Sequence, residues 1–230
     1  MKKNLLLSFL TLLSVNVFAQ LDSLKLVSAK EHAAPKKWYD NFSIRGYSQV
    51  RYNRLLETNE NLGCEQCDKS WGKDGGFFIR RMRIIFYGQI SKNVYLYVQP
   101  DFASSPSSDR LHFAQLRDAY FDVGLDDDNE YRIRIGQSKI PYGFENMQSS
   151  QNRLPLDRND ALNSAVSNER DMGVFFYWAP KETRKLFSSL VKDGLKGSGD
   201  YGVFGIGMYN GQTANKPEAN ENRHVAARLS

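Results

Sequence analysis

Residues 81–90 read Arg-Met-Arg-Ile-Ile-Phe-Tyr-Gly-Gln-Ile, and the alternation in this stretch decides the fold. One set of alternate positions is apolar or glycine: Met82, Ile84, Phe86, Gly88 and Ile90. The positions between them include charged and polar residues: Arg81, Arg83, Tyr87 and Gln89. Alternate side chains lie on opposite faces of a β-strand. The stretch is therefore predicted to be a strand with one apolar face and one charged face.

Seven further segments show the same period of two, so that eight strands are predicted in all. They lie at about 42–53, 94–101, 118–123 and 131–135 and, more weakly, at 170–178, 201–211 and 223–230. A soluble β-sandwich would show this alternation as well, with its apolar faces turned inward. Alternation alone therefore predicts an all-β fold without placing it in a membrane.

The connections between the strands favour a membrane barrel. Only residues 91–93 and 126–129 join the second strand to the third and the fourth to the fifth, whereas 54–76, 103–112 and 140–169 are long. Outer-membrane barrels alternate short periplasmic turns with long outer loops. The segment 180–199 is long where a short turn is expected, and its leucines at helical spacing predict a short surface helix.

Four arginines precede the outward apolar residues of the strands that would run down from the outer surface: Arg80, Arg117, Arg170 and Arg223. A charge is tolerated near the membrane interface but not at its centre. The arginines are expected at the outer rim, either as ordinary rim charges or as contacts to lipid phosphates. Phe42, Tyr131 and Trp178 would form an aromatic girdle at the periplasmic end.

The first residues predict export. Lys2 and Lys3 precede an apolar run, and Val17-Phe18-Ala19 is typical of a signal-peptidase site, so residues 1–19 are interpreted as a signal peptide. Residues 20–41 are predicted to be a periplasmic extension, and 42–230 the barrel. Charged residues make up 25% and the mean hydropathy is −0.54, which excludes a bundle of apolar transmembrane helices. Export argues against nucleic acid as a partner of this mildly basic chain.

Four ordered motifs resemble the phosphate-selective porin O/P family. They are residues 76–84 (Gly-Phe-Phe-Ile-Arg-Arg-Met-Arg-Ile), 116–121, 134–143 and 169–174. The resemblance covers about 42–230. It implies an outer-membrane barrel of sixteen strands, usually a homotrimer, with a loop folded into the lumen and basic side chains that guide anions. Eight strands are half of such a barrel, which predicts that the chain is truncated after Ser230. The alternative is a complete eight-stranded barrel whose lumen is filled by side chains.

An anion channel needs basic side chains on its inner wall. The predicted pore-lining and anion-binding candidates are Arg45, Arg51, Arg81, Arg83, Arg132 and Arg134. Arginine offers a planar fork of donors that suits phosphate oxygens. The competing interpretation is that these arginines pair with wall carboxylates, for which Asp101, Asp118, Asp122 and Asp171 are available.

The connection 140–169 is long enough to be functional. It is expected to be the constriction loop, with Tyr142, Phe144, Arg153 and Arg158 as its candidate residues, unless it is an exposed surface loop. Cys64 and Cys67 lie in the first outer loop and are predicted to form a local disulfide. With no second pair of ligands, a metal site is not expected.

Nothing in the sequence predicts catalysis or a cofactor, because the three histidines lie in the extension, a loop and a rim. The chain is therefore predicted to be a bacterial outer-membrane porin, in contact with lipid and lipopolysaccharide, through which small anions diffuse. Phosphate or polyphosphate are the candidate solutes. The alternatives are a weakly selective general porin, a plugged barrel that serves in binding or adhesion, and a barrel hydrolase.

Overall fold

The structure is a computed structural model, and it describes residues 37–53, 76–103, 113–153, 155, 157–166, 169–195 and 201–230. The predicted signal peptide, most of the predicted extension and the cysteine pair Cys64 and Cys67 lie outside the described residues. One compact unit spans Trp38–Ser230.

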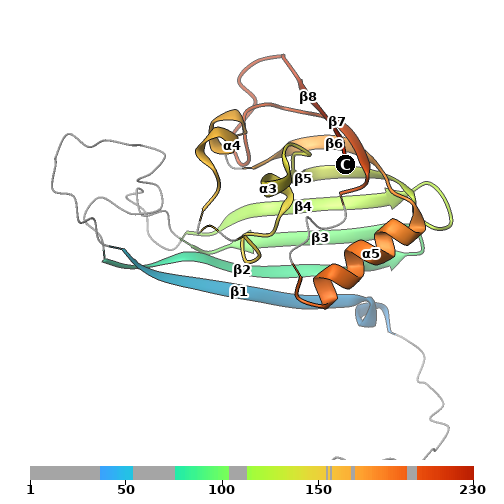
Figure 1. The fold of residues 1–230 in the computed structure, drawn as a ribbon, viewed down its shortest axis with the longest axis horizontal. Coiled ribbons are helices and arrows are strands. Elements are labelled where there is room, and N and C mark those ends of the chain that lie inside the picture. The colour runs from blue at the N-terminus through green and yellow to red at the C-terminus, as the bar shows by residue number, and fades with distance from the viewer. Residues whose placement is uncertain are drawn as a thin grey trace, which may run out of the picture. The chain divides into compact units, whose positions relative to one another are not determined.

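All eight predicted strands are present. They are β1 (Phe42–Asn53), β2 (Gly76–Ser91), β3 (Val94–Asp101), β4 (Gln115–Gly124), β5 (Tyr131–Lys139), β6 (Arg170–Trp178), β7 (Phe204–Tyr209) and β8 (His224–Leu229). Each strand pairs antiparallel with the next along the chain, so the sheet order is the sequence order (Figure 1). The all-β prediction is confirmed, and the described strands form an open sheet with β1 and β8 at its edges.

One face of the sheet is apolar and exposed, and the other is polar and covered. On β2, Met82 and Phe86 keep more than two fifths of their surface exposed, whereas Arg81 and Arg83, on either side of Met82, are buried. The same split is seen on β5, where Ile135 is exposed and Arg132 and Arg134 are buried. This arrangement is the reverse of a soluble sandwich, whose apolar face is buried. It is typical of a barrel wall that turns its apolar side to lipid.

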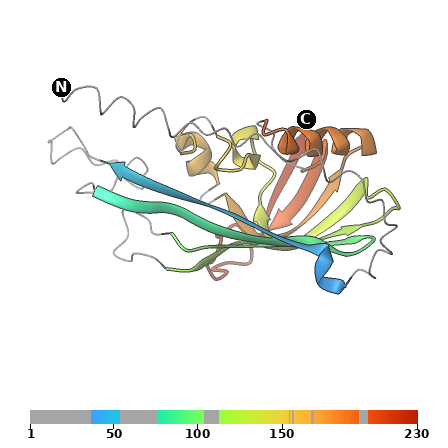
Figure 2. The same cartoon turned by 90° about the horizontal axis from the view of Figure 1, so that it is seen from below.

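Helices and the long connection cover the polar face. After a 3₁₀-helix, η1 (Trp38–Asn41), the helices are α3 (Phe144–Met147), α4 (Asp160–Ala165) and α5 (Lys181–Lys192). Figures 1 and 2 show α3, α4 and α5 on the same side of the sheet. The helix predicted within 180–199 is confirmed as α5. Among the helices that the structure describes, none has the length and apolar character needed to cross a membrane.

The two ends of the sheet differ, as the connection lengths predicted. The short turns after β2 and β4 lie at one end, here called the turn end, and α5 is held there. Lys181 Nζ lies 2.5 Å from Asp128 Oδ1, and the Arg184 guanidinium donates to the carbonyl oxygens of Asp128 and Asn129. The connection 140–169 starts from the opposite end, here called the loop end.

Candidate functional site

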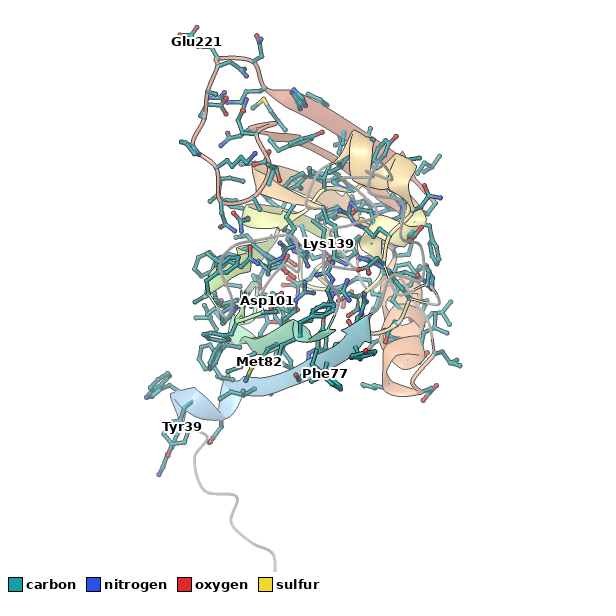
Figure 3. All side chains as sticks on the ribbon, turned by 90° about the vertical axis from the view of Figure 1, so that its left-hand side faces the viewer. Tyr39, Phe77, Met82, Asp101, Lys139 and Glu221 are labelled. Carbon is teal, nitrogen blue, oxygen red and sulfur yellow. The ribbon has the colours of Figure 1, made fainter. Side chains whose placement is uncertain are left out.

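Five of the six predicted inner-wall arginines are buried on the polar face: Arg51, Arg81, Arg83, Arg132 and Arg134. The sixth, Arg45 on β1, is exposed. All six arginines are expected on one face of the sheet, because side chains two, four or six residues apart on a strand point to the same side. Each of the six lies at such a spacing from another of them on its own strand. Figure 3 shows how crowded this side of the sheet is, with Asp101 and Lys139 among the packed side chains and Tyr39 projecting away from them.

Several of these arginines are paired with carboxylates of neighbouring strands. Arg83 Nε lies 2.7 Å from Asp101 Oδ2. Arg134 donates to both oxygens of Asp122, at 2.6 and 2.8 Å, and Arg132 lies 3.7 Å from the same carboxylate. These pairs match the competing interpretation of the sequence, in which wall arginines are held by aspartates. Asp171, the fourth candidate partner, instead accepts from backbone N–H groups, including that of Gly211.

The carboxylate of Asp157, in the long connection, forms ion pairs with three arginines of β1 and β2. Asp157 lies 2.6 Å from Arg51, 2.9 Å from Arg80 and 2.8 Å from Arg81. The side chains of Arg51 and Arg81 are almost fully buried, and Asp157 is 23% exposed. Charge-assisted hydrogen bonds of this kind are stronger than neutral ones. Asp157 therefore fastens the connection to β1 and β2.

A second contact lies earlier in the same connection. The hydroxyl of Ser150 bonds to that of Tyr47 and accepts from Arg83 at 2.9 Å. Lys139, at the end of β5, donates to the carbonyl oxygens of Met147, at 3.2 Å, and Gln148. The connection therefore lies against the polar face of the sheet over much of its length.

Glu169 is the centre of a third, buried cluster. Its carboxylate lies 2.6 Å from Arg153, 2.8 Å from Arg158 and 2.6 Å from Arg170. Arg170 in turn lies 2.9 Å from Asp118 on β4. The two predicted loop arginines, Arg153 and Arg158, thus bind the last residue of the connection that contains them. Burial alone would raise the pKa of the Glu169 carboxyl, but the surrounding cations hold that pKa well below its ordinary value.

The cluster gives a pH prediction with a definite sign. Because the folded pKa of Glu169 lies below its unfolded value of about 4.3, its contribution to stability is complete above that pH. The contribution is lost as the pH falls through the folded pKa. We expect Glu169→Gln to reduce stability at pH 7 and to flatten the decline of stability below pH 4.3, measured by urea unfolding in lipid vesicles. Glu182→Gln, an exposed change on α5, is the control, and parallel curves for Glu169→Gln and the unmodified protein would refute the assignment.

Two of the four arginines expected at the outer rim, Arg80 and Arg170, are ion-paired with carboxylates of the protein. The strand pairing shifts by one residue at Arg80 and at Arg117, so that each is the extra residue of its strand at that point. A β-bulge re-aims its side chain, and Arg80 reaches Asp157. Arg170 follows Glu169, whose φ of 70° is left-handed, and is 2% exposed within the cluster described above. Arg223 is exposed and lies 3.3 Å from Glu218, so lipid contact stays a prediction for this residue.

The remaining predicted residues are placed as follows. Tyr142 and Phe144 of the connection are about half exposed, and neither belongs to the three contacts with the wall. At the turn end, Tyr131 pairs in register with Trp178, and Trp38 packs edge-on against Phe42. This placement agrees with an aromatic girdle at that end.

The sequence did not single out Lys139, Ser150, Asp157 or Glu169 as site residues. Their role depends on a connection that folds back over the wall, and no periodic signal reports such a contact. The Glu-Arg pair at 169–170 within the fourth family motif was the one available hint.

Between the sheet, the connection and α5 lies an open cavity of about 750 Å³. Among the described residues, eight lysines or arginines and two aspartates line it. The lining includes Arg45, the polar stretch 149–152, and Phe187 and Lys192 of α5. A cavity with this excess of cations attracts anions.

Comparison with known protein families supports the porin class that the sequence predicts. A family model described as phosphate-selective porin O and P matches residues 63–230. The comparisons with curated proteins and with solved structures found no match.

Proposed function

Because the chain belongs to the phosphate-selective porin O and P family, a family of outer-membrane channels rather than enzymes, we propose that it lets small anions diffuse across the bacterial outer membrane. Phosphate and polyphosphate are the candidate solutes. The observation that carries the proposal is the cavity on the polar face, with eight cationic side chains against two carboxylates. An anion that loses part of its hydration there gains charge and hydrogen-bond donors in return.

Arg45 is the inner-wall residue best placed to meet a passing anion. Its side chain is exposed and lines the cavity, and no salt bridge to it is seen among the described residues. Arg83 and Arg134, by contrast, are buried and neutralised by Asp101 and Asp122. A charge that is already paired contributes little to the field that an ion meets. We therefore assign the selectivity to Arg45 more than to the paired arginines.

Replacement of Arg45 by alanine tests this assignment. One unit positive charge at about 5 Å in water-like surroundings favours an anion and disfavours a cation by roughly 0.8 kcal/mol each, so the anion-to-cation permeability ratio should fall about sixteenfold without it. The measurement is the reversal potential in planar bilayers under a KCl gradient. Lys185→Ala is the control, because Lys185 is exposed and already paired with Glu182.

Each outcome has a meaning for the proposal. Anion selectivity that drops in Arg45→Ala supports it, and an unchanged reversal potential would favour a weakly selective general porin. Cation selectivity of the unmodified protein would overturn anion conduction. Absence of conductance would favour the plugged barrel.

The connection 140–169 is proposed to be the constriction loop of this channel. Its support is the three sets of contacts through Ser150, Asp157 and Glu169, which hold it against the polar face. The family implies a homotrimer, and the exposed apolar face is suited to contact with lipid and lipopolysaccharide. Chemical cross-linking in native membranes tests the assembly.

A further inference from the structure

Three tyrosines form a continuous row across the polar face of the sheet. Tyr87 on β2 pairs in register with Tyr97 on β3, which pairs in turn with Tyr120 on β4. Neighbouring strands lie about 4.8 Å apart, so that the three side chains lie next to one another. The rings of Tyr97 and Tyr120 are stacked, with centroids 5.1 Å apart and planes at 12°. All three tyrosines line the cavity.

The two ends of this tyrosine row differ in charge. At one end the guanidinium of Arg134 lies 3.8 Å from the Tyr120 ring centroid, and Asp122 neutralises it. At the other end the guanidinium of Arg45 lies 5.1 Å from the Tyr87 ring centroid. No carboxylate pairs with Arg45 in the described part of the chain. The row therefore ends in one neutralised cation and one that is available to an anion.

Polar groups accompany the aromatic surface. The hydroxyl of Tyr97 donates to Gln99 at 2.8 Å, and Gln99 itself lines the cavity. Ser149 and Asn152 of the connection line it as well, as does Ser188 of α5. The cavity thus combines an aromatic strip, amide and hydroxyl groups, and an available cation.

Inorganic phosphate would use only part of this surface, because it has no apolar side to pack on tyrosine. A sugar ring has an apolar C–H face and a rim of hydroxyl groups, which aromatic rings and amides complement. The volume of about 750 Å³ is within the range of small-molecule sites.

We propose that the tyrosine row is a binding site for the sugar ring of a phosphorylated monosaccharide, whose phosphate is held by Arg45. This inference rests on the proposed function, since it names a solute class for the same anion path. It goes further in assigning the tyrosines a task that a phosphate channel does not require. Gln99 and the hydroxyl groups of the connection would meet the sugar hydroxyls.

The test is block of the channel current in planar bilayers by glucose 6-phosphate, inorganic phosphate and glucose, each added alone. Contact with the aromatic row should let glucose 6-phosphate block at a concentration about tenfold lower than that of inorganic phosphate. Tyr97→Leu removes the aromatic ring but keeps an apolar side chain. We expect this variant to lose the tenfold preference and to keep its response to inorganic phosphate.

The control is Tyr131→Leu, which alters an exposed tyrosine on the apolar face of β5 and should keep the preference. Equal block by the two phosphates would overturn the sugar site and leave the anion channel standing. Stronger block by adenosine monophosphate than by glucose 6-phosphate would also overturn it. A cation-selective channel that no phosphate blocks would instead refute the proposed function, so the two failures are distinguishable.

Discussion

Replacing Arg170 with methionine should cost the folded protein about 3 to 5 kcal/mol, the usual loss when one partner of a buried ion pair is removed. Arg170 is 2% exposed and joins Asp118 on β4 to Glu169 at the start of β6, at 2.9 and 2.6 Å. Its loss leaves the buried carboxylate of Asp118 without this cation. Urea unfolding in lipid vesicles at pH 7 measures the effect.

Lys185→Met provides the matched control, because it removes an exposed cation whose pairing with Glu182 contributes little. The double variant Arg170→Met with Asp118→Asn removes both charges of the pair. We expect it to be more stable than Arg170→Met alone, since the uncompensated carboxylate is gone. A loss below about 1 kcal/mol in Arg170→Met would show that the cluster does not stabilise the wall.

Asp157→Asn should release the long connection from the wall. The change removes the charge that Arg51, Arg80 and Arg81 share. With a loss of about 3 kcal/mol, the ratio of bound to released connection falls by about a hundredfold. We expect larger and noisier single-channel currents and faster proteolysis within 140–169, measured on the reconstituted protein.

Asp127→Asn is the control for this change, because Asp127 is 90% exposed and pairs with Lys92 at the turn end. Its currents and its proteolysis should match those of the unmodified protein. Unchanged conductance and proteolysis in Asp157→Asn would mean that this carboxylate does not hold the connection, and the proposed constriction would lose its main support.

The strands could be predicted because their signal is local. Each short run of alternating residues carries its own evidence, and the contrast between Met82 and Arg83 is enough to assign two faces. The lengths of the connections then separated the turn end from the loop end. Even α5 was foreseen, because its leucines repeat at helical spacing within a few residues.

The destination of Arg80, Arg117 and Arg170 could not be predicted in the same way. Strict alternation places all three with the apolar residues, but at Arg80 and Arg117 a single extra residue in one strand changes where the side chain points. Such a register shift depends on the partner strand, as between Gln49 and Val50 of β1 opposite Arg80. The left-handed backbone of Glu169 could not be predicted either, because this residue lies in a buried cluster with side chains such as Arg153 that are distant in the sequence.

The sequence by itself determined that this chain forms an antiparallel sheet with an apolar and a charged face, and that it resembles the phosphate-selective porin O/P family. Tertiary structure alone decided which arginines are neutralised, that Asp157 and Glu169 hold the long connection, and that Tyr87, Tyr97 and Tyr120 form one row. The physical reason is distance along the chain. Alternation reports on neighbouring residues, whereas ion pairs and the tyrosine row join residues from different strands, which only register and loop folding bring together.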